Sequence, residues 1–315
     1  MKVSVIVPTY KRAWSLPYLL DGLANQSVKP NEVIIILKPS GDGSEDVIRQ
    51  YMNRLNIKLI IQERGLAIDA YDTGIREAKS DLVLFTDDDG IPHPDWVKRY
   101  IELFSELENA GGISGLWFSA FLVNNKLVLS NEPQISEIRP AKRVFYRKPL
   151  KELEGYCHWF SISGIPSGEG ICNGPIIKTI IFGGVNMGFR REAIEGLNLA
   201  KLYRGSRRGF YFEHFMAYYV VRKGFDAYMV IDPSLTPVVW HIQHTSSLSR
   251  KPGFWTEFWR HFDRASLYFR LKRLGANVSF PAYLVASLTL MRKRMLPRLL
   301  ATAYAILYNT LYVRD

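Results

Sequence analysis

Three consecutive carboxylates are the group in this 315-residue chain best suited to chemistry. Asp87, Asp88 and Asp89 follow directly on the apolar run Leu82–Thr86 and are followed by Gly90. Carboxylates so close together at a strand end repel one another unless a cation lies beside them. A hard divalent ion that also carries a phosphate meets this need, because such ions take oxygen ligands and often reach a protein through one or two carboxylates. A solvated acidic turn is the alternative.

The elements that position these carboxylates follow from the alternating pattern of the first hundred residues. Four short apolar runs predict strands covered on both faces: Val3–Pro8, Val33–Leu37, Lys58–Gln62 and Leu82–Thr86. Helical stretches are predicted near Ser15–Asn25, Ser44–Leu55, Leu66–Ala78 and Asp95–Leu107, with Ser15 and Ser44 as N-caps. This alternation predicts a mostly parallel α/β sheet. Ligands of such sheets bind at the carboxyl ends of the strands, so the segments that follow those ends should meet in one crevice: Pro8–Arg12, Lys38 and the three aspartates.

The rest of the chain is less regular. Gly111–Gly184 has no clean period and predicts an irregular, substrate-facing region with added strands and loops. Four later segments predict, in order, a glycine-rich turn into a helix, an amphipathic helix, a strand and a polar loop with two histidines: Gly183–Ile194, Gly209–Phe225, Ala227–Ile231 and Trp240–Ser247.

Composition indicates a folded protein, since 47% of the residues are hydrophobic and 23% are charged. The two cysteines, Cys157 and Cys172, are too few for a disulfide framework or a paired CxxC metal site, and they suit a reducing compartment. The N-terminus enters a strand pattern directly, so we expect no signal peptide.

Most of the net charge of +11 lies in the last part of the chain. Residues 250–315 contain twelve Lys/Arg and three Asp/Glu, a net charge of +9, mixed with aromatic side chains. Phe254–Lys272 therefore predicts a helix that lies in a membrane interface. The apolar stretches Val278–Met291 and Leu299–Val313 have fourteen and fifteen residues, fewer than the ~20 of a straight membrane span. They predict a monotopic hairpin or spans lengthened by snorkelling arginines, and two ordinary buried helices are the alternative.

A nucleic-acid arm would also explain the basic residues. Stretches such as AYLVASLTLM, however, have no use in a nucleic-acid groove, so we expect membrane lipids and no nucleic acid as partners. We therefore divide the chain into a catalytic unit, residues 1–249, and a membrane-associated unit, residues 250–315.

The order of the motifs resembles that of the family 2 glycosyltransferases over about residues 1–270. The motifs are VSVIVPTYKR, EVIII, RGLAIDAYDTGIREAKSDLVLFTDDD, GGVNMGFRREA, YFEHF and WHIQHTSS. The tail looks like that of membrane-associated members, including polyprenyl-phosphate sugar synthases and cellulose-synthase-like enzymes. The resemblance implies an α/β GT-A fold, Rossmann-like with a mostly parallel sheet, followed by an interfacial or membrane helical region. It also implies an inverting transfer of a sugar from a nucleotide diphosphate donor, usually with Mg²⁺ or Mn²⁺.

The resemblance assigns residues to the donor and the metal. Asp89 is the expected direct metal ligand, and Asp87 and Asp88 would hold the ribose and the waters of the metal. Asp87 and His244 complete the expected metal set, although a loop histidine such as His241 or His244 is often unliganded. Two turns match the family's nucleotide-binding turns: Pro8, Thr9, Tyr10 and Arg12, and then Arg64 and Gly65. A solvated loop residue is the alternative for Arg12.

Inversion requires a base that takes the proton of the attacking hydroxyl. The family's acidic motif at a helix start reads Tyr211-Phe212-Glu213-His214 here, so Glu213 is the expected base and His214 the second choice. Glu213 could instead only interact with its helix N-terminus. Gly184 and Asn186 are expected on the acceptor side by resemblance.

The donor is not decided by any residue. Lys38 stands where family members commonly carry acidic residues that hold the base, and its ammonium can donate to a carbonyl of either guanine or uracil. The tail favours GDP-mannose by analogy with lipid-linked mannosyl transfer, with a lipid-linked glycan or polyprenyl phosphate as acceptor at the cytoplasmic membrane face. A UDP-sugar-dependent enzyme of cell-surface polysaccharide synthesis and a non-catalytic nucleotide-sugar-binding protein are the alternatives.

Overall fold

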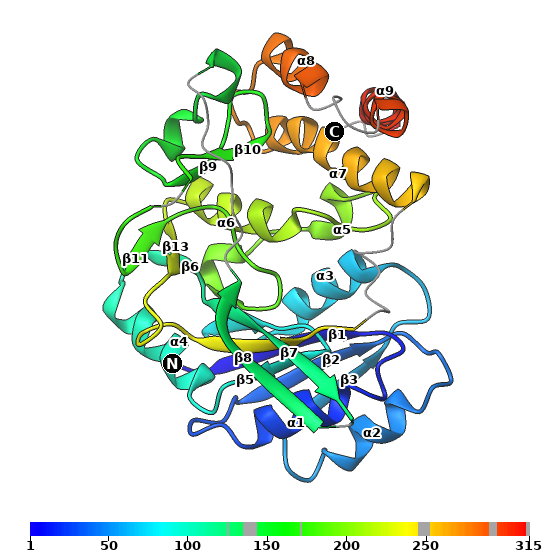
Figure 1. The fold of residues 1–315 in the computed structure, drawn as a ribbon, viewed down its shortest axis with the longest axis vertical. Helices are drawn as coiled ribbons and strands as arrows, with labels where there is room; N and C mark the ends of the chain where they lie inside the picture. Colours follow the sequence, from blue (N-terminus) through cyan, green and yellow to red (C-terminus); the bar gives the residue numbers. More distant parts are fainter. Residues whose placement is uncertain (125, 135–143, 171, 245–252, 290–294, 313–315) are drawn as a thin grey trace.

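A mixed eight-stranded sheet forms the centre of the molecule (Figure 1). The computed structural model describes residues 1–124, 126–134, 144–170, 172–244, 253–289 and 295–312. The strand order is β11-β13-β6-β12-β4-β1-β2-β3, and β4, β1, β2 and β3 run parallel. Their bounds are β1 Val3–Thr9, β2 Glu32–Leu37, β3 Ile57–Ile61, β4 Leu82–Phe85, β6 Ala110–Ser114, β11 Ile176–Lys178, β12 Met187–Arg190 and β13 Asp226–Val230.

A second sheet starts directly after the three aspartates. It has the order β5-β14-β7-β8, with bounds β5 Gly90–Pro92, β14 Val238–Ile242, β7 Leu116–Val123 and β8 Lys126–Gln134. In its antiparallel pair β5–β14, His241 lies opposite Gly90, and the Ile242 N–H donates to the Asp89 carbonyl oxygen at 2.9 Å. A two-stranded sheet pairs β9 His158–Phe160 with β10 Pro166–Gly168, and the Cys157 N–H just before β9 donates to the carbonyl oxygen of Lys178, the last residue of β11, at 2.8 Å.

Helices cover both faces of the large sheet. Their bounds are α1 Leu16–Ala24, α2 Ser44–Gln50, α3 Ala67–Glu77, α4 Trp96–Glu106, α5 Leu199–Leu202, α6 Phe212–Arg222, α7 Phe254–Arg273, α8 Phe280–Thr289 and α9 Met295–Leu311. Figure 1 shows α1 and α2 below the sheet and α3, α5 and α6 above it, with α7 and then α8 and α9 at the top.

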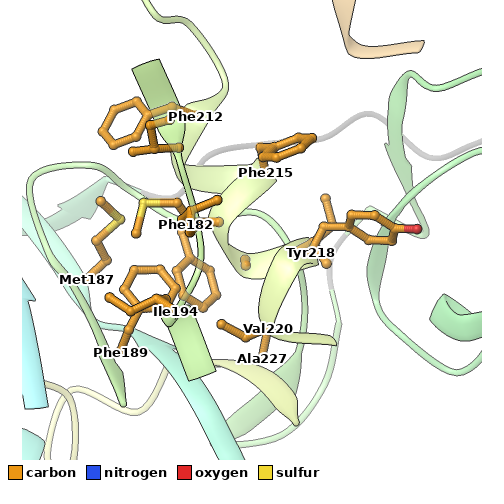
Figure 2. Packing of buried hydrophobic residues seen from close by; sticks show 14 of the residues in the cluster. Phe182, Met187, Phe189, Ile194, Phe212, Phe215, Tyr218, Val220 and Ala227 are labelled. Atoms are coloured by element: carbon orange, nitrogen blue, oxygen red, sulfur yellow. The ribbon is translucent and has the colours of Figure 1, made fainter. Parts of the chain in front are cut away.

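The strand pattern explains these layers. Alternate side chains of β1 point to opposite faces, so Val5 and Val7 join the core with α1 and α4, whereas Ile6 joins the core with α3 and α6. A Cβ on Gly74 of α3 would lie 2.5 Å from the Ile6 side chain, so the glycine lets this helix approach the sheet closely. Figure 2 shows Phe182 beside α6, which carries Phe212. The large sheet therefore has two cores, one on each face.

The predicted strands and helices of the first hundred residues are confirmed. Ser44 is the first residue of α2 and not its cap, because Gly43 occupies the cap position with φ +86°. Gly183–Ile194 forms β12 and a short 3-10 helix, Glu192–Ile194, in place of the expected helix. Trp240, predicted in a polar loop, lies in β14, and residues 245–247 of that loop fall outside the described residues.

Cys157 and Cys172 are joined by a disulfide, which corrects the expectation that they remain reduced. They lie 15 residues apart on either side of the hairpin formed by β9 and β10, which brings the chain back on itself. A count of two cysteines excludes a framework of several bridges but does not exclude a single one.

The described residues of the basic tail form the helices α7, α8 and α9, and a helical tail was expected from the sequence. α9 packs its small side chains Ala301 and Ala305 against Phe258 and Phe262 of α7. None of the helices in the described part of the chain is both long enough and apolar enough to cross a bilayer. Met291 and Val313, the ends of the two predicted apolar stretches, lie outside the described residues.

Candidate active site

Two of the three aspartates and one histidine form a group that could hold a metal ion. The ligand atoms of Asp87, Asp89 and His241 all lie within 4.8 Å of one another. His241 Nε2 is 2.9 Å from Asp89 Oδ1, a contact set by the register of β14 against β5. Carboxylate oxygens suit Mn²⁺ and Mg²⁺, and a neutral imidazole nitrogen is a common metal ligand. The donor set therefore fits the divalent ion expected from the sequence.

Arg12 and Tyr71 surround the same carboxylates. The Arg12 guanidinium lies 3.0 Å from Asp88 Oδ1 and 3.6 Å from Asp89 Oδ2. The Tyr71 hydroxyl donates to Asp87 Oδ1 at 3.1 Å, and the Tyr10 N–H donates to Asp88 Oδ2 at 3.2 Å. Arg12 is thus directed into the site, unlike a solvated loop residue.

The electrostatics of the site favour a bound cation. Burial, followed by the neighbouring Asp89 charge, raises the pKa of Asp88 to about 7, although Arg12 opposes the shift. The same two causes raise the pKa of Asp87. One arginine thus compensates the carboxylates only in part, and a divalent ion would supply the missing positive charge.

The predicted nucleotide-binding turns lie together at the carboxyl ends of β1, β2 and β3. Lys38 Nζ donates to the Gly65 carbonyl oxygen at 2.8 Å and lies 5.8 Å from the centre of the Tyr10 ring. Gly65 has φ +102°, a conformation that favours glycine. Arg64 is exposed beside it, and Pro8 and Thr9 end β1. The structure thus brings these predicted donor residues to one edge of the sheet.

Glu213 lies in the first turn of α6 with 20% of its side chain exposed. Burial raises the pKa of Glu213 to about 8, and the charges of Asp87 and Asp263 act in the same direction. Phe212, the neighbour of Glu213 in the chain, has its ring 4.4 Å from the Tyr71 ring, and the Tyr71 hydroxyl donates to Asp87. The start of α6 therefore lies beside the aspartates. A carboxyl with a pKa near neutrality is suited to accept a proton during a reaction.

His214 is a much weaker candidate for the base. Burial, followed by the charge of His158, lowers the pKa of His214 to about 3. Its Nδ1 lies 3.8 Å from Glu213 Oε1. An imidazole with so low a pKa is neutral but binds a proton weakly, so the geometry and electrostatics favour Glu213.

His241, and not His244, lies beside the aspartates in the structure. His244 is exposed, with its ring 4.5 Å from the Trp14 ring, and it is not part of the group formed by Asp87, Asp89 and His241. The sequence signal for His241 was the β-rich run VVWHI, whose histidine belongs to a strand rather than to a loop.

Asn186, expected on the acceptor side, is fully buried, and its role toward the acceptor stays a prediction. Its Oδ1 accepts from Trp96 Nε1 at 2.8 Å and from the Tyr100 hydroxyl at 2.9 Å. Its Nδ2 donates to the carbonyl oxygens of Leu116 at 2.6 Å and Pro237 at 2.8 Å. An amide side chain has four such bonds to make, and all four are made inside the protein.

Gly184, the other residue expected on the acceptor side, is half-buried beside α6. A Cβ on Gly184 would lie 3.9 Å from the ring of Phe212, the residue that precedes Glu213 in the chain. Its role toward the acceptor stays a prediction.

A second group of possible ligands lies elsewhere, at Cys157, His158 and Cys172. The two cysteines are joined in the disulfide. The ring nitrogens of His158 lie 3.1 Å from Thr179 Oγ1 and 3.0 Å from the Gly170 carbonyl oxygen. These bonds satisfy the ring, so this group does not compete with the aspartate group as a metal site.

Comparisons with known proteins agree with this geometry. The model of the family described as glycosyl transferase family 2 matches residues 4–163, half of the chain. A chondroitin synthase from Escherichia coli is 36% identical over 110 residues, which are 34% of this chain and 16% of that protein. The amylovoran biosynthesis glycosyltransferase AmsB from Erwinia amylovora is 28% identical over 161 residues, 50% of this chain and 52% of that protein. The matched stretches thus span about half of these relatives or less.

Solved structures are similar in fold. TarS 1-349 from S. aureus has a TM-score of 0.52 and a sequence identity of 14%, and the match covers 99% of this chain and 81% of the TarS chain. The mannosyltransferase PcManGT from Pyrobaculum calidifontis, in complex with GDP-Man and Mn²⁺, has a TM-score of 0.52 and a sequence identity of 18%. This match covers 100% of this chain and 76% of the PcManGT chain. With the sheet, the carboxylate group and the family match in agreement, the chain belongs to glycosyl transferase family 2 and is a glycosyltransferase of the GT-A-like α/β fold.

Proposed function

We propose that this enzyme is an inverting, metal-dependent glycosyltransferase that moves a sugar from a nucleotide diphosphate donor to a lipid-linked acceptor at a membrane surface. The observation that carries the proposal is the grouping of Asp87, Asp89 and His241 within ligand distance of one another. Arg12 and Glu213 complete the site with a cation and a proton acceptor.

The proposed chemistry assigns a role to each group. Asp87, Asp89 and His241 would hold a Mn²⁺ or Mg²⁺ ion, which would supply positive charge beside the diphosphate. Arg12 adds a second positive charge at the same place, where charge develops on the leaving group. Glu213 takes the proton of the acceptor hydroxyl while the oxygen of that hydroxyl bonds to the anomeric carbon of the donor sugar. The bond from that carbon to the diphosphate oxygen breaks, and the nucleoside diphosphate leaves with the electron pair.

The donor-binding edge is proposed to consist of the two turns that contain Tyr10 and Gly65, with Lys38 between them. Lys38 can donate to a base carbonyl, which suits guanine and uracil alike. GDP-mannose is our first choice, and the similar fold of PcManGT, a mannosyltransferase solved with GDP-Man and Mn²⁺, is consistent with it. TarS, which has been solved with UDP-GlcNAc, supports a UDP-sugar as the second choice.

Membrane attachment is proposed from the outer face of the last two helices. α9 packs its alanines inward against α7 and leaves large apolar side chains outside. The leucines among these exposed residues on α8 and α9 are Leu284, Leu288, Leu296, Leu299, Leu300, Leu307 and Leu311. An apolar outer face next to a segment of net charge +9 fits the surface of an anionic bilayer. We therefore propose residues 1–249 as the catalytic unit and residues 250–315 as the membrane-associated unit.

Vesicle flotation tests the attachment. The full chain should float with vesicles that contain anionic phosphatidylglycerol and much less with pure phosphatidylcholine. Leu307→Glu should reduce flotation, whereas Val123→Glu, an equally exposed apolar position on β7, should not. Equal flotation of both variants and the wild type would refute the role of α9.

The function itself is tested by donor turnover. Purified enzyme with Mn²⁺ or Mg²⁺ is offered a panel of GDP- and UDP-sugars, with and without polyprenyl phosphate, and the release of nucleoside diphosphate is measured. Selective, metal-dependent release from GDP-mannose, absent in Asp89→Ala, is the expected result. Release from a UDP-sugar alone would replace the proposed donor, and transfer that survives chelation of the metal would refute the mechanism.

A further inference from the structure

A buried ion pair on α7 is directed at the segment that leads into the catalytic helix. Asp263 is 0% exposed and Arg270 is 1% exposed, and Asp263 Oδ1 lies 3.0 Å from Arg270 Nη2. Burying two charges is costly, and apolar side chains of the same size would pack α7 equally well. The pair therefore needs an explanation other than packing.

The hydrogen bonds of the pair supply that explanation. The Phe210 N–H donates to Asp263 Oδ2 at 3.1 Å, and Arg270 Nε donates to the Leu202 carbonyl oxygen at 3.1 Å. The Arg270 guanidinium also lies 3.7 Å from the centre of the Tyr203 ring. Both ends of the segment between α5 and α6 are thus bound to one face of α7.

Ser206 extends the same network into the turn before α6. Burial raises the pKa of the Asp263 carboxyl, and the Ser206 hydroxyl is among the groups that oppose this rise. The same hydroxyl accepts from the Gly209 N–H at 2.8 Å and from the Arg208 N–H at 3.3 Å. Gly209 has φ +69°, and Tyr211, the cap of α6, has φ +70°. A left-handed conformation is unfavourable for a tyrosine and persists only where the surroundings impose it.

The direction of the Glu213 side chain depends on this turn. Glu213 follows Tyr211 by two residues, and successive residues of a helix point about 100° apart. A small change in where α6 begins would therefore turn the carboxylate away from the aspartate group. Catalytic groups tolerate little misplacement, so a rigid support for this turn has a direct use.

We propose that Asp263 and Arg270, here called the α7 clamp, are positioning residues that fix the start of α6 and thereby aim Glu213 at the acceptor hydroxyl. This inference rests on the proposed function of Glu213 as the base. The clamp makes no contact with the donor-binding turns among the described residues, so it should act on the catalytic step and not on donor binding.

The test compares steady-state kinetics of full-length variants, with release of GDP from GDP-mannose in Mn²⁺ as the readout, or of UDP from UDP-GlcNAc where that donor is the one turned over. Asp263→Ala breaks the clamp, and Ser206→Ala removes only one hydroxyl, so it remains decisive where Asp263→Ala does not fold. Arg273→Met is the matched control, because Arg273 lies on the same helix but bonds to Asn309 of α9. All assays are run well below each variant's melting temperature.

We expect Asp263→Ala and Ser206→Ala to lower kcat roughly ten- to a hundred-fold, with the donor KM within about two-fold of the wild type. Arg273→Met should keep both constants. Wild-type kcat in Ser206→Ala, or equal losses in Arg273→Met, would overturn the clamp. Glu213→Gln in the same series separates the two ideas: full activity there refutes the base itself, whereas its inactivity beside fully active clamp variants refutes the clamp alone.

Discussion

Replacing Glu213 with glutamine tests the assignment of the base most directly, because the change keeps the size of the side chain and removes its proton affinity. General bases contribute roughly a hundred- to ten-thousand-fold to rate, or about 3 to 5 kcal/mol of the barrier. The kcat of Glu213→Gln should fall by that factor. Glu192→Gln, the same substitution at an exposed glutamate, should have no effect.

The pH profile gives an independent magnitude. With a pKa of about 8, Glu213 is ionised in only about a tenth of wild-type molecules at pH 7, so kcat/KM should rise nearly ten-fold per pH unit below about 7.5 and level off above 8. The assay is release of nucleoside diphosphate from about pH 6 to about pH 9.5. A flat wild-type profile over that range would refute the reasoning.

Stability should move in the opposite direction to activity. The pKa of Glu213 is raised from 4.5 to about 8 by burial, so between these values the unfolded chain loses its proton first and the free energy of unfolding decreases as pH rises. Glutamine carries no charge and removes this penalty. The melting temperature of Glu213→Gln at pH 7 should therefore equal or exceed that of the wild type, which also shows that lost activity is not lost folding.

Three further predictions concern the metal, the fold and the donor. Asp89→Asn and His241→Ala should each weaken Mn²⁺ binding by roughly ten-fold or more in calorimetric titration, whereas His244→Ala should not, because only the first two belong to the metal group. Asn186→Ala should lower the free energy of unfolding by about 3 kcal/mol or more in urea, because it leaves buried donors and acceptors without partners. Lys38→Ala should raise the donor KM several-fold without changing kcat, which corresponds to a loss of about 1 kcal/mol of donor binding free energy. The reason is that the Lys38 ammonium lies at the donor-binding turn. An unchanged KM would show that Lys38 does not bind the donor.

The sequence by itself was enough to predict the strands and helices of the first hundred residues and the position of the three aspartates among them. Runs such as Val3–Pro8 and Leu82–Thr86 are apolar over the length of one strand, and the helices between them end at recognisable turns, so local pattern was enough. The position of the aspartates after a strand then placed them at the ligand-binding edge of a parallel sheet. The apolar pattern of Gly209–Phe225 predicted the helix that carries Glu213, and the family resemblance added the expected role of Glu213 as the base.

Tertiary structure decided which distant residues share the site. His241 reaches the aspartates only because β14 pairs with β5 in one register, and a shift by one residue would have turned it to the opposite face. The side-chain amide of Asn186 makes its hydrogen bonds to partners between 51 and 90 residues away in the chain. The disulfide of Cys157 and the low pKa of the His214 ring likewise depend on packing that surrounds each group from several elements. Local sequence patterns report the period and ends of an element, whereas strand register, burial and pKa arise from contacts between elements, and only the folded chain brings those together.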